Sequence, residues 1–119
     1  MRVDFKEMTT LDLDESSANI LGYKGFRKKD GFYYIERKKV KGMLKKWNPT
    51  GDISQAWPII VDNHIDVIAP RPYVDYLWQC QIVGKVVGEK MIWSKGINPL
   101  VEAIRVFVIK NIDKLENIE

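Results

Sequence analysis

The sequence predicts an α+β fold, in which a small antiparallel sheet of three or four strands is covered by helices. Three segments have the apolar spacing of amphipathic helices: residues 9–22, 51–62 and 98–115. The segments between them are short, rich in β-branched and aromatic residues, and bounded by glycine, proline and asparagine. The resulting order is helix, charged hairpin, helix, three strands and helix. A fold in which helices pack on an antiparallel sheet accommodates elements in that order.

The bulk composition indicates one soluble globular domain over residues 1–119. With 119 residues, 45% of them hydrophobic and 29% charged, the chain can bury an ordinary core. The single cysteine, Cys80, cannot form an internal disulfide, which is typical of a reducing compartment. The first residues lack the apolar segment of a secretory signal, and no apolar run is long enough to span a membrane. We therefore expect a cytoplasmic protein with no membrane partner.

Positive charge is concentrated in one segment, residues 24–46. The formal net charge of the chain is +3, but this segment alone carries ten basic and two acidic residues. Basicity is therefore a local property and not one of the whole surface. Asp30-Gly31 is a turn signal between two short β-like runs, which predicts a small charged hairpin. We expect this hairpin to be an excursion from the main fold and its least anchored part.

The first helix begins at a threonine cap, Thr9 or Thr10, and ends at Gly22, which suits the left-handed residue after a helix. Acidic residues occupy its first turns, where the helix dipole favours negative charge: Asp12, Asp14 and Glu15. Its inward stripe is expected to be modest and to consist of Leu13, Ser17, Ile20 and Leu21.

The second helix, from Asp52, runs directly into a short strand at residues 65–69, with His64 in the turn between them. Asp52 can cap this helix, and Gln55, three residues later, can complete a capping box. Pro58 falls inside the helix and should kink it. The inward face is expected to consist of the apolar residues at helical spacing, Ile53, Ala56, Trp57, Ile60 and Val61.

Two further strands are expected before the last helix. Residues 73–83 alternate between two faces, and residues 91–93 can return as an antiparallel strand. Cys80 lies between Trp78 and Ile82 on one face of this alternation. It is therefore expected to be a small buried hydrophobe, and a nucleophile paired with a histidine is the weaker interpretation.

The last helix has the clearest signals. Asn98 is a good N-cap, and Pro99 suits the first helical position. Val106 and Ile109 lie off the main apolar stripe, so the helix is apolar around much of its girth. We expect it to be covered on two sides, by the sheet and by another helix or a second copy of the chain.

The basic segment contains the components of a nucleic-acid interface. Lysine and arginine neutralise phosphates, and aromatic rings stack on unpaired bases. The residues assigned to such an interface are Lys28, Lys29, Tyr33, Arg37, Lys38, Lys39, Lys45 and Lys46. The alternative is a solvated hairpin whose aromatic side chains pack on the domain and whose lysines keep it soluble.

No arrangement typical of catalysis or metal binding is visible. One histidine and one cysteine provide no zinc-site spacing, and no phosphate loop, dinucleotide fingerprint or serine-hydrolase motif is present. We therefore expect no catalytic residue, metal or cofactor, although folding could assemble a site in a cleft between the sheet and the central helix. Trp57 and Trp78 could line a pocket or contact a partner, and core packing is the alternative for both.

Two pieces of the chain carry a family resemblance. In residues 48–68 an Asn-Pro-Thr-Gly turn precedes a helix with a Pro-Ile-Ile core and then a short strand, and residues 98–109 contain Pro-Leu followed by Ala-Ile-Arg. These pieces, in this order, resemble the NinX-like family of small bacteriophage proteins. Residues 13–22 fit the family's N-terminal segment more loosely, and residues 24–46 do not match its pattern. The resemblance implies a phage or prophage origin and expression in the bacterial cytoplasm, and it implies no catalytic residues.

The expected function is that of a non-enzymatic phage accessory protein that binds a host or phage macromolecule, with a protein as the leading partner. The alternative is a nucleic-acid-binding protein that uses residues 24–46. The two differ in salt behaviour, because phosphate binding weakens steeply with salt whereas an apolar protein interface does not. The off-stripe residues of the last helix also suggest a homo-oligomer through that helix.

Overall fold

The computed structural model describes residues 6–36, 43–71, 75–82 and 92–112. Within these ranges the chain forms three helices and two antiparallel sheets of three strands each, which confirms the predicted α+β class. The strands therefore divide between two sheets, where a single sheet was expected.

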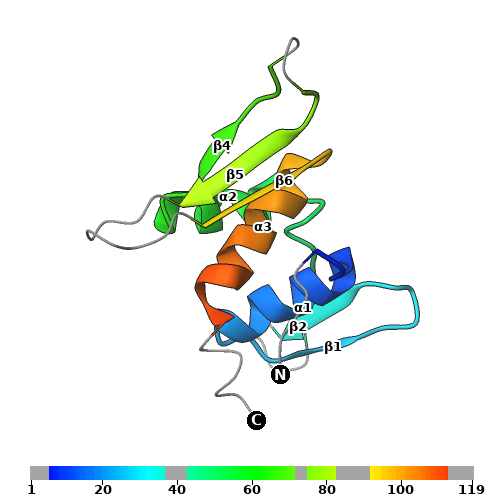
Figure 1. Ribbon diagram of the computed structural model, residues 1–119. Coiled ribbons are helices and arrows are strands. Elements are labelled where there is room, and N and C mark those ends of the chain that lie inside the picture. Colours follow the sequence, from blue (N-terminus) through cyan, green and yellow to red (C-terminus); the bar gives the residue numbers. More distant parts are fainter. Residues whose placement is uncertain (1–5, 37–42, 72–74, 83–91, 113–119) are drawn as a thin grey trace.

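The helices are α1 (Thr10–Ile20), α2 (Ile53–Asp62) and α3 (Pro99–Lys110). The first sheet contains β1 (Gly25–Arg27), β2 (Tyr33–Glu36) and β3 (Leu44–Trp47), with β2 in the middle. The second sheet contains β4 (Asp66–Ile68), β5 (Trp78–Ile82) and β6 (Ile92–Gly96), with β5 in the middle. Figure 1 shows β4, β5 and β6 above and β1 and β2 below, with α1 and α3 between them. Among the described residues, no helix is long and apolar enough to cross a bilayer.

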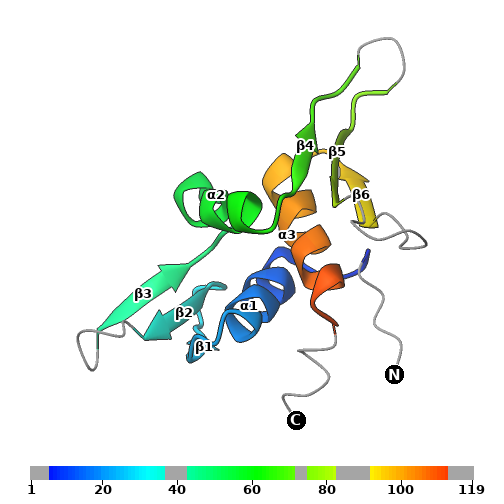
Figure 2. The same ribbon diagram turned by 90° about the vertical axis from the view of Figure 1, so that its left-hand side faces the viewer.

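The last helix, α3, is the centre of the fold. It packs on β5 and β6 on one side and on α1 and α2 on the others (Figure 2). Its middle turns, from Glu102 to Val108, are therefore buried almost all round. The predicted cover on two sides comes from the second sheet and from helices of the same chain. Val106 is fully buried in this way, so its place off the main stripe is explained without a second copy.

Local signals place the start of α3 as predicted. The Asn98 side chain accepts hydrogen bonds from two backbone N–H groups of the first turn, at 3.0 and 3.4 Å, and Pro99 is the first helical residue. The helix ends at Lys110 with Asn111 as its C-cap. Residues 113–115, at the end of the predicted helix, lie outside the described residues.

The first helix also begins and ends at the expected residues. The Thr9 hydroxyl accepts from the Asp12 N–H at 3.1 Å, while the Asp12 carboxylate accepts from the Thr9 N–H at 3.0 Å, forming a capping box. Gly22 has a φ of +82° and closes the C-terminus. Asp14, one of the acidic residues of the first turns, is buried.

The basic segment forms the first sheet. Its turn is the one predicted, because the Gly31 N–H donates to the Lys28 carbonyl at 3.1 Å and Gly31 has a φ of +88°. One face of this sheet enters the core beside α1 through Tyr33, Ile35 and Trp47. The described part of the segment is therefore anchored, in contrast to the loosely attached hairpin expected from its charge.

The second helix, α2, begins where predicted but faces the core with different residues. Asp52 caps it and accepts from the Ser54 N–H at 2.9 Å. Gln55 does not complete a capping box, because its side chain accepts from the Asn48 N–H at 2.6 Å and donates to the Lys46 carbonyl at 2.8 Å. These bonds turn Gln55 inward, and the buried face consists of Gln55, Ala56, Ile59 and Ile60. Three residues expected on that face are exposed instead: Ile53, Trp57 and Val61.

In the second sheet, Cys80 lies at the centre of β5 and is fully buried against α3. It pairs with Val67 on β4 and Ser94 on β6. The edge strand β4 is shorter than predicted, and its three residues are exposed. His64, in the turn before β4, is confirmed as a turn residue and has a φ of 52°.

Candidate functional site

The outer face of the first sheet gathers aromatic and basic side chains. Strand pairing places Phe26 on β1 opposite Tyr34 on β2, and Tyr34 opposite Lys46 on β3. Side chains alternate between the two faces of a strand, so these residues lie on the face opposite Tyr33. Phe32 is two residues from Tyr34 and therefore lies on the same face as Tyr34. We call this surface the outer platform and define it by Phe26, Lys28, Phe32, Tyr34 and Lys46.

Two lysines of the outer platform lie over aromatic rings. The Lys28 ammonium is 4.1 Å from the centroid of the Tyr34 ring, and the Lys46 ammonium is 3.4 Å from that of Phe32. Such cation–π contacts hold the ammonium groups close to the sheet surface. Phe26 remains 49% exposed. The outer platform thus presents aromatic surface and positive charge together.

One carboxylate, that of Asp30, lies at the edge of the outer platform. The Tyr34 hydroxyl donates to Asp30 Oδ2 at 2.6 Å, and the Phe32 N–H donates to Oδ1 at 3.0 Å. The Tyr34 bond, more than the Phe32 bond, lowers the pKa of Asp30, and the charges of Lys28 and Lys46 lower it further. The same contact with Asp30 raises the pKa of Tyr34. Asp30 is thus an anion between two lysines.

The structure sorts the predicted nucleic-acid residues into three groups. Lys28 and Lys46 lie on the outer platform, and Lys29 is exposed in the adjoining turn. Tyr33 lies on the inner face with its side chain only 3% exposed, so it is not positioned to stack on a base at the outer platform. Lys45 lies on the inner side, opposite Ile35. The others, Arg37, Lys38 and Lys39, lie outside the described residues.

A cleft of about 420 Å³ lies on the inner side of the first sheet, between α2, β3 and the C-terminal ends of α1 and α3. Its apolar lining includes Tyr23, Trp47, Ile59 and Phe107, and its polar lining includes Lys45, Asp62, Asn63 and Asn111. The Tyr23 and Trp47 rings meet edge to face, with centroids 5.2 Å apart. We call it the α2 cleft.

The two tryptophans assigned to a pocket or partner lie on different elements. Trp57 on α2 is 58% exposed, Trp78 on β5 is partly buried, and neither lines the α2 cleft. Trp57 instead forms an exposed apolar row with Ile53 and Val61, at positions i, i+4 and i+8 of the helix. We call this row the α2 stripe.

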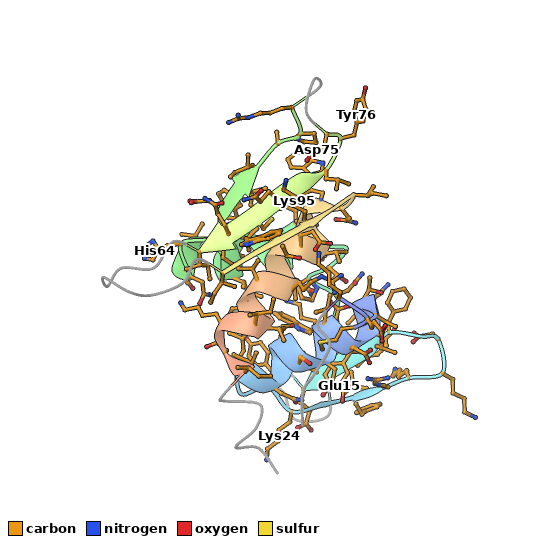
Figure 3. All side chains as sticks on the ribbon, viewed as in Figure 1. Glu15, Lys24, His64, Asp75, Tyr76 and Lys95 are labelled. Carbon is orange, nitrogen blue, oxygen red and sulfur yellow. The ribbon has the colours of Figure 1, made fainter. Side chains whose placement is uncertain are left out.

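Cys80 and His64 are unsuited to act as nucleophile and base. The Cys80 thiol is fully buried and donates to the Pro99 carbonyl at 3.4 Å. Burial, and then the nearby Glu102 carboxylate, raise its pKa to about 12, so it is not a thiolate at neutral pH. His64 points away from the molecule beyond α2 (Figure 3). Over the described ranges, no three histidine, cysteine or acidic side chains could together hold a metal ion.

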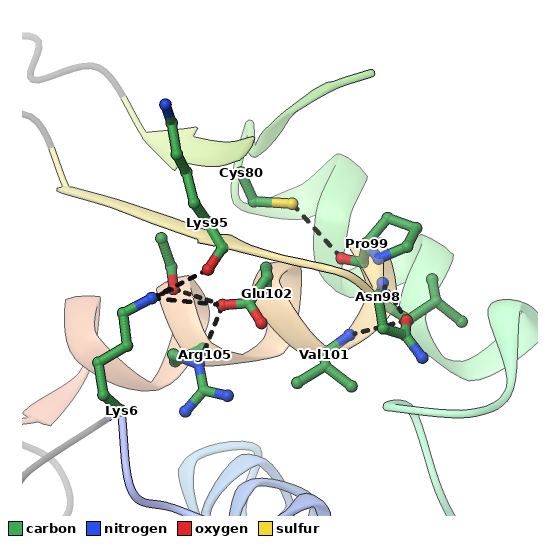
Figure 4. Close-up of polar contacts among 10 residues, drawn as sticks. Lys6, Cys80, Lys95, Asn98, Pro99, Val101, Glu102 and Arg105 are labelled. Atoms are coloured by element: carbon green, nitrogen blue, oxygen red, sulfur yellow. Dashed lines mark hydrogen bonds and ion pairs between the residues drawn. The ribbon is translucent and has the colours of Figure 1, made fainter. Parts of the chain in front are cut away.

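A buried ionic cluster beneath the second sheet was missed by sequence reasoning. Glu102 Oε1 accepts from the Ser94 hydroxyl at 2.5 Å and from Arg105 Nε at 3.1 Å, and Lys6 donates to Ser94 Oγ at 3.2 Å (Figure 4). Ser94 is only 1% exposed, so its hydroxyl cannot reach a substrate and the cluster is structural. The available signal was two charges three residues apart, Glu102 and Arg105, within otherwise apolar helical turns.

The fold and these surfaces define a small α+β protein in which two antiparallel sheets flank a central helix. A similar arrangement occurs in a solved structure described as a 2.0 Å crystal structure of a phage protein from Bacillus cereus ATCC 14579. That chain is 15% identical, the match covers 95% of this chain and 94% of that one, and the TM-score is 0.59, which shows a shared fold.

The family is shown by a second comparison. The chain belongs to the family described as Bacteriophage P22, NinX, whose model matches residues 9–111. This match confirms the resemblance seen in residues 48–68 and 98–109, and it extends through the basic segment that had not fitted the pattern. A comparison with curated proteins finds no match.

Proposed function

We propose that this phage protein binds single-stranded nucleic acid on the outer platform, in the cytoplasm of its bacterial host. The observation that supports this most directly is the cross-strand pair of Phe26 and Tyr34, with lysines on both sides of it. Exposed rings on a regular sheet can stack on bases, and each stacked base contributes roughly 1–3 kcal/mol. Only unpaired bases offer their faces, so single strands are the expected ligand.

The charges of the outer platform fit the phosphate backbone. Lys28 lies over the Tyr34 ring and Lys46 over the Phe32 ring, close to where the phosphates of a strand with stacked bases would run. In the sequence, the connection from β2 to β3 carries four further basic residues, Arg37, Lys38, Lys39 and Lys41. Each lysine or arginine that neutralises a phosphate steepens the dependence of affinity on salt by about one unit.

The experiment is fluorescence anisotropy with a labelled oligothymidine of about 12 nucleotides, its duplex, and the RNA equivalent, across a salt series. Tyr34→Leu should weaken binding by removing a stacking ring. Lys28→Gln/Lys46→Gln should weaken it and flatten the salt slope. The charge-matched control is Lys95→Gln/Lys110→Gln, on β6 and α3, which should bind as the wild type does. No binding at low salt, or equal loss in the control, would remove this function.

A protein partner is the second candidate, and the α2 stripe favours it. Ile53, Trp57 and Val61 are each at least half exposed, although they form one continuous apolar row. Such a row fits the apolar surface of a protein, with contacts that salt does not weaken. Affinity purification from host cells should recover a partner with the wild type but not with Ile53→Ser/Trp57→Ser. Equal recovery by the variant would exclude the α2 stripe.

A homo-oligomer through α3 remains a separate proposal. Of the two off-stripe residues that suggested it, Val106 is buried within the chain. Only Ile109, which is partly buried, still supports an oligomer. Sedimentation equilibrium measures it directly: a mass of one chain over the micromolar range would remove the proposal. A mass of two chains that falls to one in Ile109→Glu would support it.

A further inference from the structure

Three helices end at the α2 cleft. Its lining includes the C-cap residue of each one, Leu21, Asn63 and Asn111. The aligned peptide dipoles place roughly half a negative charge at the last turn of a helix. This partial charge remains although some of the carbonyls accept local bonds, as those of Ile59 and Phe107 do from the side chains of Asn63 and Asn111. Asp62 adds a carboxylate to the same lining. This end of the cleft therefore favours a positively charged group.

The chain already directs one of its own ammonium groups to this end. Lys110, in the last turn of α3, places Nζ 3.4 Å from Asn63 Oδ1. Lys45, which lines the cleft, interacts with the opposite end of α2. Hydrogen bonds from Ser54 lower the pKa of Asp52 there, and the charge of Lys45 lowers it further. Asp52 and Asp62 are ten residues apart, about 15 Å along a helix. Among the described residues, Lys45 forms no ion pair with Asp62.

The rest of the cleft can hold an apolar stem. Tyr23, Trp47, Ile59 and Phe107 form its apolar lining, and its volume of about 420 Å³ suits a small ligand or a long side chain. We propose that the α2 cleft binds an organic cation on an apolar stem. Its ammonium or guanidinium group would lie at Asp62 and the helix ends, and its stem on the apolar lining. This site is on the face of the first sheet opposite the outer platform, and its test is independent of nucleic-acid binding.

Two sources carry this chemistry, a free amine and a lysine or arginine side chain of a peptide. The test is a titration of the ¹⁵N-labelled protein followed by amide and indole N–H shifts. The probes are 1-pentylamine, an ammonium ion at neutral pH, a capped Ala-Arg-Ala tripeptide, and 1-pentanol as the uncharged counterpart of the amine. The amine or the tripeptide should shift the Trp47 indole N–H and the amides of Asn63 and Asn111, whereas 1-pentanol should shift them much less.

Variants at the charged end provide the decisive comparison. Asp62→Asn should weaken 1-pentylamine or tripeptide binding by up to about fivefold, as loss of an exposed ion pair does. Lys110→Gln should tighten it, because the competing ammonium is removed. Asp66→Asn, on the exposed strand β4, is the charge-matched control and should have no effect.

Each outcome of the titration supports or overturns the proposed cation site. Shifts with 1-pentylamine but not with the tripeptide support a free amine as the ligand. Shifts with the tripeptide, whether or not 1-pentylamine also causes them, support a peptide side chain. Equal shifts with 1-pentanol would overturn the requirement for a cation. No shift at millimolar probe, or unchanged affinity in both Asp62→Asn and Lys110→Gln, would overturn the site.

Discussion

Asp14 and Thr50 form a two-point hydrogen bond between α1 and the loop that leads into α2. Asp14 Oδ1 accepts from the Thr50 backbone N–H at 3.1 Å, and Oδ2 accepts from the Thr50 hydroxyl, also at 3.1 Å. Both residues are buried, although 36 positions separate them in the chain. The contact holds the loop in place beside α1 and so helps to orient the start of α2.

This buried carboxyl should make stability depend on pH. Burial raises the pKa of Asp14 to about 6, against the lowering effect of the bonds from Thr50. Between the ordinary value of 3.8 and about 6, the folded protein binds more protons than the unfolded chain, so the free energy of unfolding falls as pH rises. Asp14→Asn lacks this effect. Relative to the wild type, it should gain about 1–3 kcal/mol between pH 4 and pH 7, measured by urea unfolding.

Asp12 is a control with the opposite sign. The hydrogen bond from the Thr9 backbone, together with Arg27, lowers the pKa of Asp12 in the folded state. Its stabilising effect is therefore present above about pH 4 and is lost as pH falls through the lowered pKa. Asp12→Asn should be less stable than the wild type at pH 7 and approach it in acid. Parallel pH profiles for the Asp12 and Asp14 variants would contradict both assignments.

Helix ends could be predicted from the sequence because their causes are local. Asn98, Thr9 and Asp52 each cap a helix by bonding N–H groups two or three residues away. The orientation of α2 could not be predicted, because its cause is distant. Gln55 bonds the backbone at Lys46 and Asn48, so a polar residue faces inward and the α2 stripe turns outward. The spacing of the apolar residues alone had predicted that the α2 stripe faces the core.

The candidate site was predicted as a segment but not as a surface. Composition identified the basic and aromatic residues of 24–46, and the turn at Asp30 identified the hairpin. Which side of each strand faces the core depends on α1, where Trp47 Nε1 donates to Ser17 Oγ at 3.0 Å. That contact buries the Tyr33 side of β2 and leaves Tyr34 outside. No pattern within the segment distinguishes these two tyrosines.

The Glu102–Arg105 pair should show strong energetic coupling. Both side chains are buried, so each substitution removes one member of a buried ion pair, which typically costs about 3–5 kcal/mol. Glu102→Leu and Arg105→Leu should each be strongly destabilising, and the double variant should be more stable than their sum predicts. A double-mutant cycle by denaturant unfolding should give a coupling of about 1–3 kcal/mol.

Lys6 is the matched control for this cycle. Its ammonium is 3.9 Å from Glu102 Oε1, but its side chain is 60% exposed. Exposed pairs contribute roughly 0–1 kcal/mol, so Lys6→Gln should have little effect. Additive effects of the two leucine substitutions would show that Glu102 and Arg105 do not act as a pair.

Gly25 is required by the close approach of β1 to β2. A Cβ at this position would overlap the Tyr34 carbonyl oxygen and lie 2.6 Å from Cε2 of the buried Tyr33 ring. Gly25→Ala must therefore shift β1, and thermal unfolding should show a loss of about 1–3 kcal/mol. Gly31→Asn is the comparison, because Gly31 has open space around it and asparagine tolerates its positive φ. A Gly25→Ala protein as stable as the wild type would mean that β1 is loosely held.

Asp30 should limit the affinity of the outer platform for nucleic acid. Its carboxylate lies beside Lys28 and Lys46, where it repels phosphate. Asp30→Asn removes that charge, and the amide oxygen can still accept from the Phe32 N–H that supports the turn. Binding of the labelled oligothymidine should tighten by about two- to fivefold at low salt, and the gain should shrink as salt screens the charge. Asp66→Asn, on the second sheet, removes an equal charge and should change nothing. An equal gain in both variants would point to net charge, and no gain in Asp30→Asn would place the nucleic acid away from this turn.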